Sequence, residues 1–202
     1  MRTYASYAQA PPKFIAGARC LDFLNTTEDD RMERLTSYSE FVFWSKAAGL
    51  IDSAGQRRLL ALAAKQPHAA AKALALVLAA RAALADLFTG SAPQRTRAMA
   101  AINEVLAQDR FVMQLESGKS GLRQHWKPDS PELRQSLLTL LREAAVLLSS
   151  PARAQIHHCA GDDCGWLFLD TSRNQSRRWC EMETCGNKAK ARAHYHRQRM
   201  DA

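Results

Sequence analysis

Residues 159–185 read CAGDDCGWLFLDTSRNQSRRWCEMETC and contain four of the five cysteines in the chain. The cysteines form two pairs with the same internal spacing, Cys159 with Cys164 and Cys180 with Cys185. Zn²⁺ prefers four tetrahedral ligands, and thiolate sulfurs at about 2.3 Å satisfy it. The spacing therefore predicts a zinc site with these four ligands. Because four thiolates leave no open position, the ion would be structural and not catalytic.

The sequence leaves alternatives to this site open. Histidines flank the cluster on both sides, and one of them could replace a cysteine as a ligand; they are His157, His158, His194 and His196. Two disulfides or four buried thiols would also fit the pattern, although a reducing compartment favours metal over disulfides. Cys20 stands apart from the cluster and is predicted to be an ordinary buried thiol.

Residues 151–202 are predicted to form a small C-terminal module around this site. A module of about 50 residues with few apolar side chains usually needs a metal or disulfides to fold. Residues 165–170 have the pattern of a strand, a polar loop follows, and residues 177–180 would supply a second strand. The segment after Cys185 is rich in helix formers, so the second pair would lie at a helix start in a treble-clef-like layout.

Positive charge is concentrated in the same module. Residues 171–202 hold eight Lys and Arg against three Asp and Glu, which gives +5 of the total charge of +8. Cations from the loop and from the helix could converge on phosphates. The candidate DNA-binding residues are Arg173, Asn174, Arg177, Arg178, Lys188, Lys190, Arg192, Arg197 and Arg199. The alternative is a solvated helix that packs its alanines on the metal site.

Residues 1–150 are predicted to form a helical domain with one β-hairpin, so the fold class is mainly α. Helical periodicity and capping residues place helices at about 38–48, 52–66, 69–88, 94–107 and 132–150. Ser37 and Glu40 have the form of a reciprocal capping box, Asp52 or Ser53 can cap the second helix, and Ser130 with Pro131 can open the last. Alternating side chains over residues 111–116 and 122–126 predict the hairpin. Residues 14–26 begin the ordered part and are ambiguous between helix and strand.

Several classes of function lack support in the sequence. Charged residues interrupt the long alanine-rich stretch, so no run of about 20 apolar residues suggests a membrane span. The first residues lack the apolar core of a signal peptide, and we expect a cytoplasmic protein. Glycine-rich phosphate loops and the G-x-S-x-G and H-E-x-x-H motifs are absent, so we do not expect an enzyme.

The C-terminal sequence resembles a known family. The run from residue 159 to residue 197 is similar to the CGNR zinc fingers of bacteria, named for a motif that here is Cys185-Gly186-Asn187-Lys188, and the fit covers nearly all of residues 157–197. Lys188 replaces the arginine, which keeps the charge but loses the planar fork for two hydrogen bonds. Upstream, residues 21–26 (LDFLNT) resemble the ABATE domain that accompanies this finger in stress-induced transcription regulators. The resemblance implies a helical N-terminal domain, which would sense a small molecule, coupled to a DNA-binding zinc finger.

Two functional hypotheses follow. The first is a zinc-dependent, DNA-binding transcriptional regulator that responds to a ligand or to stress. The second is a small-molecule sensor with Asp22, Asn25, Trp44 and Arg81 near a pocket, whose zinc module binds RNA or a protein. An Asp–Asn pair among apolar residues is more often a turn or a cap, and a Trp on an amphipathic helix is normally core. A homodimer would suit a DNA-binding protein, but no motif indicates one.

Overall fold

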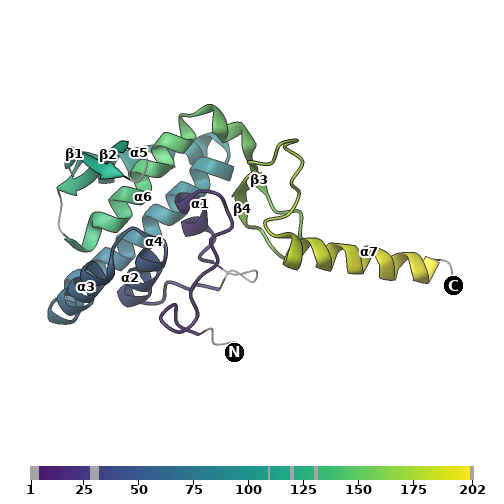
Figure 1. Ribbon diagram of the computed structural model, residues 1–202, viewed down its shortest axis with the longest axis horizontal. Helices are drawn as coiled ribbons and strands as arrows, with labels where there is room; N and C mark the ends of the chain where they lie inside the picture. Colours follow the sequence, from purple (N-terminus) through teal and green to yellow (C-terminus); the bar gives the residue numbers. More distant parts are fainter. Residues whose placement is uncertain (1–4, 28–31, 109, 119–120, 130–131, 201–202) are drawn as a thin grey trace. The chain divides into compact units, whose positions relative to one another are not determined.

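The computed structural model describes residues 5–27, 32–108, 110–118, 121–129 and 132–200 (Figure 1). Its chain divides into two compact units. The first, the helical unit, comprises Met1–Pro12 and Leu35–Val146. The second, the cysteine unit, comprises Lys13–Arg34 and Leu147–Ala202. Within the described residues, no helix is both long and apolar enough to cross a bilayer.

The helical unit confirms the mainly α prediction, including the hairpin. Its elements are α2 (Tyr38–Ala47), α3 (Ser53–Lys65), α4 (Pro67–Thr89), α5 (Ala92–Ala107), β1 (Arg110–Gly118), β2 (Gly121–Asp129) and α6 (Glu132–Leu148), the last of which runs into the cysteine unit. The cap predicted at residues 130 and 131, before α6, lies outside the described residues.

Local sequence signals explain where two of these helices begin. The Ser37 side chain accepts a hydrogen bond of 3.3 Å from the backbone N–H of Glu40, and Asp52 caps α3 in the same way. The predicted reciprocal bond from Glu40 is replaced by a tertiary one. Its carboxylate instead accepts bonds from the Ser6 hydroxyl and the Tyr7 N–H, at 2.6 and 2.8 Å. This side chain therefore fixes the N-terminal residues of the helical unit.

Aromatic and leucine side chains form the core of the helical unit. The rings of Phe41 and Trp44 stack with centroids 6.4 Å apart, and both side chains are buried. Helix α6 contributes fully buried leucines at residues 137, 138, 140 and 141. Tyr38 donates a hydrogen bond of 2.8 Å from its hydroxyl to the Leu133 carbonyl, which joins α2 to α6. Each buried side chain of this size contributes about 1.5–3 kcal/mol through the hydrophobic effect.

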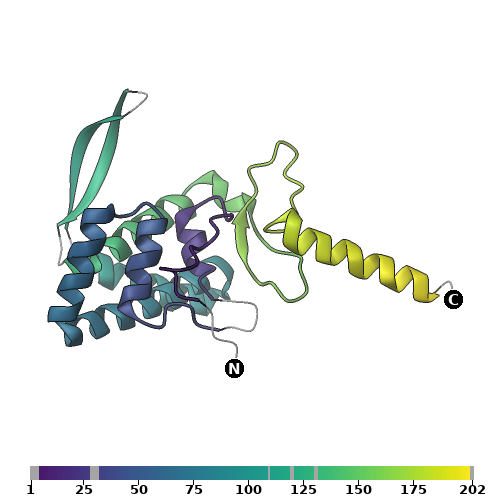
Figure 2. The ribbon, with the colours of Figure 1, turned by 60° about the horizontal axis from the view of Figure 1, so that its bottom comes forward.

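The hairpin stands away from the helices of its own unit (Figure 2). Its strands pair in an antiparallel register that sets Met113 opposite residue 126 and Leu115 opposite Gln124. Because opposite residues share a face, this register collects apolar residues on one side of the hairpin. Met113, Leu115 and Leu122 are all exposed. The sequence pattern thus predicted the strands correctly, although the apolar face is not a core face.

The cysteine unit combines two segments that lie far apart in sequence. Its elements are α1 (Arg19–Leu24), a 3₁₀ turn (Pro151–Gln155), β3 (Ile156–His158), β4 (Leu167–Leu169), a π-helical turn (Met182–Gly186) and α7 (Asn187–Met200). The prediction that residues 177–180 supply the second strand was wrong. Strand β4 pairs with β3, which precedes the first cysteine, and residues 177–180 form no strand. The ambiguous segment around residues 14–26 contains a short helix.

The position of residues 13–34 differs from the expected organisation. The sequence predicts that they belong with the helices in a domain of residues 1–150, and the 150/151 boundary stays a prediction. In the compact units, however, Lys13–Arg34 belongs with the residues that carry the cysteine cluster. The physical reason is a set of hydrogen bonds to β4, described below.

Candidate metal centre and basic surface

The four cysteines predicted as ligands converge on one point. Their sulfur atoms all lie within 4.8 Å of one another. Cys164 and Cys180 are separated by 3.6 Å between sulfurs, and Cys180 and Cys185 by 3.7 Å. A tetrahedral ion with bonds of about 2.3 Å requires sulfurs about 3.8 Å apart, whereas a disulfide requires about 2.05 Å. The donor set therefore fits a single tetrahedral metal ion, and the cysteines are not paired as disulfides.

Backbone groups support the first cysteine pair. The Cys159 sulfur accepts hydrogen bonds from the N–H groups of Gly161 and Cys180, at 3.4 and 3.3 Å. These donors stabilise negative charge on the sulfur. A Cβ atom at Gly161 would lie 3.2 Å from the Cys164 Cβ and 3.3 Å from the Cys185 sulfur. Glycine at position 161 therefore lets the backbone pass close to the sulfurs, whereas Gly186 lies close to the Met182 side chain.

Crowding of the thiols makes a bound cation favourable. Hydrogen bonds, first from Cys180, lower the pKa of Cys164 to about 6. The hydrogen bond with Cys164 and burial raise the pKa of the Cys180 thiol. Burial and the Cys164 sulfur raise the pKa of Cys185 to about 11. One thiolate thus opposes ionisation of its neighbours, and a divalent cation would remove that opposition.

The segment at residues 15–27 forms hydrogen bonds along β4. Asn25 accepts the Leu167 N–H at 2.9 Å and donates its amide N–H to the Leu167 carbonyl at 2.8 Å. Leu169 donates its N–H to the Ala16 carbonyl at 2.7 Å. The Trp166 indole N–H donates to the carbonyl of residue 27 at 3.2 Å. The segment is therefore held against β4 by backbone and side-chain hydrogen bonds.

Asp22 stabilises the turn that brings this segment to β4. Its carboxylate accepts the N–H groups of Ile15 and Ala16, at 3.0 and 2.9 Å. Burial raises the pKa of Asp22 to about 6, against the lowering effect of these two bonds. Gly17, with φ of +79°, follows the turn and lies close to Leu169. Asp22 thus stabilises a turn, and the Asn25 amide bonds the backbone of a strand far away in sequence, while a ligand-binding role for either residue stays a prediction.

The other two predicted ligand-binding residues belong to the helical unit. Trp44 is 1% exposed in the core, and Arg81 on α4 is also buried. Asp22 and Asn25 lie in the cysteine unit, so the four residues are divided between the two units, and the ligand-binding hypothesis stays a prediction.

Arg177 is half-buried in the cysteine unit, unlike the exposed Arg178 beside it. Its guanidinium donates to the carbonyls of Ile15 and Trp179 at 2.9 Å each, and also to the Cys180 carbonyl. The same group lies 4.4 Å from the centre of the Phe168 ring. The Arg177 guanidinium therefore links the N-terminal segment, β4 and the second cysteine pair. These contacts occupy its N–H groups within the unit.

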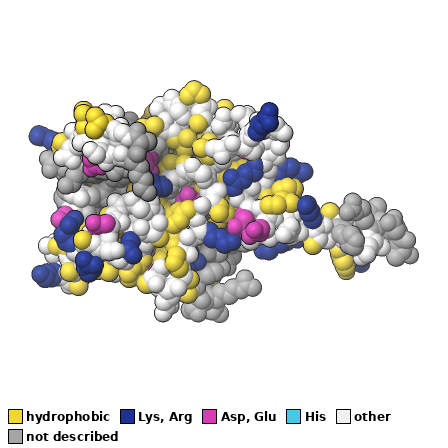
Figure 3. All heavy atoms as spheres, viewed as in Figure 1, with side chains coloured by type: hydrophobic (Ala, Val, Ile, Leu, Met, Phe, Trp, Pro, Cys, Tyr) yellow, Lys and Arg dark blue, Asp and Glu magenta, His cyan; other side chains and the backbone are white. Residues whose placement is uncertain are grey.

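Most other candidate DNA-binding residues are exposed in the cysteine unit. The exposed set is Arg173, Asn174, Arg178, Lys188, Lys190, Arg192 and Arg199. Arg178 lies over the Trp179 ring and Arg199 over the Tyr195 ring, contacts that the sequence analysis did not anticipate. Figure 3 shows dark blue Lys and Arg side chains near the start of α7. Arg197 is in α7, but its side chain lies outside the described residues.

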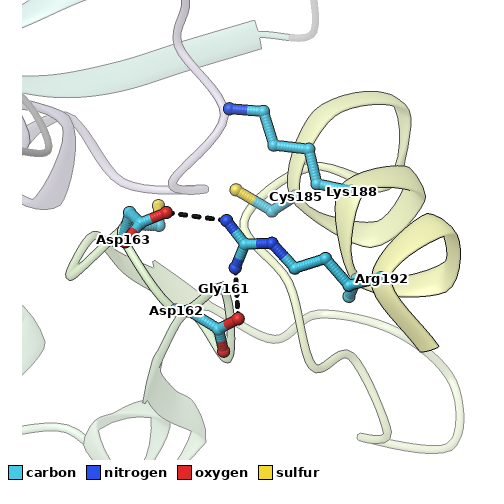
Figure 4. A pocket seen from close by; sticks show the side chains of 8 residues that line it. Gly161, Asp162, Asp163, Cys185, Lys188 and Arg192 are labelled. Atoms are coloured by element: carbon cyan, nitrogen blue, oxygen red, sulfur yellow. Dashed lines mark hydrogen bonds and ion pairs between the residues drawn. The ribbon is translucent and has the colours of Figure 1, made fainter. Parts of the chain in front are cut away.

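A shallow pocket beside the cysteine sulfurs lies between α7 and the first cysteine loop (Figure 4). It is lined by Lys188 and Arg192, one helical turn apart, and in the view of Figure 4 Cys185 lies between their side chains. Arg192 forms ion pairs with Asp162 and, at 2.8 Å, with Asp163. Arg192 therefore orients α7 on the cysteine cluster, and its charge is already balanced. The adjacent acidic pair at residues 162 and 163 was the sequence signal for this contact.

Comparison with known families agrees with this arrangement. Residues 17–151 match the model of the ABATE family, described as "Putative stress-induced transcription regulator", and residues 155–198 match that of the CGNR zinc finger. A search of curated proteins found no match to the chain. The first match covers more than half of the sequence. The chain therefore belongs to the ABATE family and carries a CGNR zinc finger at its C-terminal end.

Proposed function

We propose that the protein is a zinc-dependent transcriptional regulator that binds duplex DNA through its cysteine unit. The observation that carries this proposal is the proximity of exposed cations to a closed four-thiolate site in one compact unit. The four cysteines would hold Zn²⁺, which supplies charge and a crosslink and leaves no position for a reacting water. Folding of a unit this small would then depend on the ion.

The exposed cations fit a role in phosphate binding. Lys188 and Lys190 start α7, and Arg178 extends from the loop that precedes the second cysteine pair. Lysine ammonium groups bind phosphate as point charges and release counterions from DNA, which makes the affinity dependent on salt. The described part of α7 has few apolar side chains that a partner could bury. A hydrated, negatively charged partner therefore suits this helix better than an apolar protein surface.

The test measures binding of the zinc-loaded full-length protein to duplex DNA over a range of salt concentrations. We expect log K to fall with log salt, and Lys190→Ala to reduce the slope by about 0.9. Arg57→Ala is the matched control, because this exposed arginine lies in the helical unit. Affinity that does not vary with salt, or tighter binding to structured RNA than to DNA, would contradict the proposal.

The response to an effector is a separate proposal. We propose that a small molecule or stress signal acts through the helical unit; the family description supports the link to stress, and no residue is assigned to the response. We propose no catalytic role for the chain, and Cys20, the cysteine outside the cluster, is 1% exposed. The cytoplasmic location and the homodimer stay predictions from the sequence.

A further inference from the structure

The loop at residues 171–176 leaves β4 and is held at its base by a buried carboxylate. Asp170 is fully buried, and its two oxygens accept the N–H groups of Ser172 and Arg177, at 2.9 and 2.8 Å. These bonds and one from the Ser172 hydroxyl, which is the strongest influence, hold the pKa of Asp170 below its usual range. A single side chain thus fastens both ends of the loop.

The returning end of the loop has a second attachment. The backbone N–H of Arg177 bonds Asp170, and its guanidinium donates to the carbonyls of Ile15, Trp179 and Cys180. The loop is therefore anchored both to the N-terminal segment and to the second cysteine pair. Because the ends are fixed, the residues between them are presented in a defined position with little entropy left to lose on binding.

The loop tip, defined as residues 173–175, is a tight turn. The N–H of Gln175 donates to the Ser172 carbonyl at 3.1 Å, and Gln175 has φ of +46°. A non-glycine residue in this left-handed region costs of order 1 kcal/mol. The tip side chains Arg173, Asn174 and Gln175 are all exposed, and within the described residues none of the three has a hydrogen-bond partner.

The chemistry of the tip differs from that of α7. Arginine pairs with the O6 and N7 atoms of guanine through two hydrogen bonds, and asparagine or glutamine pairs with the N6 and N7 atoms of adenine. All three tip side chains are of these kinds. On α7, Lys188 and Lys190 are point charges, and the guanidinium of Arg192 is occupied by two carboxylates. Phosphate contacts position a protein on DNA, whereas base contacts give specificity.

We propose that Arg173, Asn174 and Gln175 read base edges in the major groove while the exposed cations of α7 contact phosphates. This inference rests on the DNA-binding function proposed above. The major groove, about 12 Å wide, admits elements as large as a helix or a two-stranded ribbon, so a projecting turn can enter it. The finger would then obtain its specificity from the loop between the cysteine pairs and its general affinity from the helix.

The experiment selects preferred duplexes from a random pool with the zinc-loaded full-length protein. It then measures the ratio of affinities for selected and random duplexes. Asn174→Ala and Arg173→Ala should each lower this ratio by roughly tenfold or more. Gln175→Gly removes the third side chain without strain, because glycine adopts the left-handed region freely, and should also lower the ratio. Lys190→Ala should weaken binding to both duplexes equally and leave the ratio unchanged.

The controls separate the two proposals. Zinc content and circular dichroism identify any variant that fails to fold, and Gln198→Ala removes an exposed amide from α7 instead of from the tip. Binding by the wild type with a ratio that the tip variants leave unchanged would overturn base reading and leave DNA binding intact. A wild type that binds duplexes without any sequence preference would do the same. Failure of the wild type to bind any duplex would overturn both.

Discussion

Asn25→Ala tests whether the N-terminal segment is a structural part of the cysteine unit. The substitution removes both hydrogen bonds between the Asn25 amide and the backbone of Leu167. A typical hydrogen bond contributes about 1 kcal/mol, and an unpaired buried partner adds to its loss, so we expect local destabilisation of about 2–3 kcal/mol. That free energy corresponds to roughly a 30- to 150-fold increase in the population of the opened state.

Amide hydrogen exchange on the zinc-loaded full-length chain measures this opening directly. Peptides that cover Leu167–Leu169 should exchange faster by roughly that factor, because Leu167 loses its acceptor and Leu169 depends on the adjacent Ala16 carbonyl. Peptides from α4, in the helical unit, should keep their rates. Asn103→Ala is the control, since this residue is exposed on α5. Unchanged protection of residues 167–169 in a folded Asn25→Ala protein would refute the assigned role of the segment.

Three further predictions concern the same unit. Arg177→Lys should speed zinc release to a chromophoric chelator, because lysine cannot reach the three carbonyls with one planar group; equal release rates for Arg177→Lys and Arg178→Lys would contradict this. Gly161→Ala should lower zinc affinity in the same assay by about tenfold or more, since its Cβ would crowd the Cys185 sulfur at 3.3 Å, and an unchanged affinity would count against the described geometry. The pKa of Asp22, raised to about 6, means that the folded state binds this proton more tightly than the unfolded state, so stability falls as the pH rises from about 4 to about 6. Asp22→Asn should remove that decline and be more stable at pH 7.5 by about 1–2 kcal/mol, as measured by urea denaturation; parallel profiles for the two proteins would exclude this account.

Much of the helical unit could be predicted from local sequence. Ser37 and Asp52 were identified as caps because their short polar side chains precede helical periodicity, and both accept the expected N–H. Caps depend on residues three positions apart, which the sequence shows directly. The strands of the hairpin were also predicted, since alternation has a period of two whether or not a face is buried. Exposure of that face depends on what packs against it, and the pattern does not contain this information.

The convergence of the four cysteines was predictable for a similar reason. Two cysteine pairs with equal spacing restrict the geometry strongly, because each short turn can place two sulfurs near one ion. The exposure of each cationic side chain was less predictable. Arg177 and Arg178 are neighbours of the same type, yet one binds three backbone carbonyls and the other is exposed over Trp179. A difference of one position decides whether an arginine is half-buried against backbone carbonyls or exposed, and composition does not contain this information.

The sequence by itself determined the helices, the hairpin, the thiolate cluster and the concentration of positive charge, since each depends on residues within a few positions of one another. Only the tertiary structure decided which distant segment completes the cysteine unit. Asp22 and Asn25 looked like candidates for a ligand because they are polar residues among apolar ones. Their partners are the N-terminal turn and Leu167, the latter 142 residues away. Buried polar groups must find hydrogen-bond partners, but which partners they find is settled only when the chain folds.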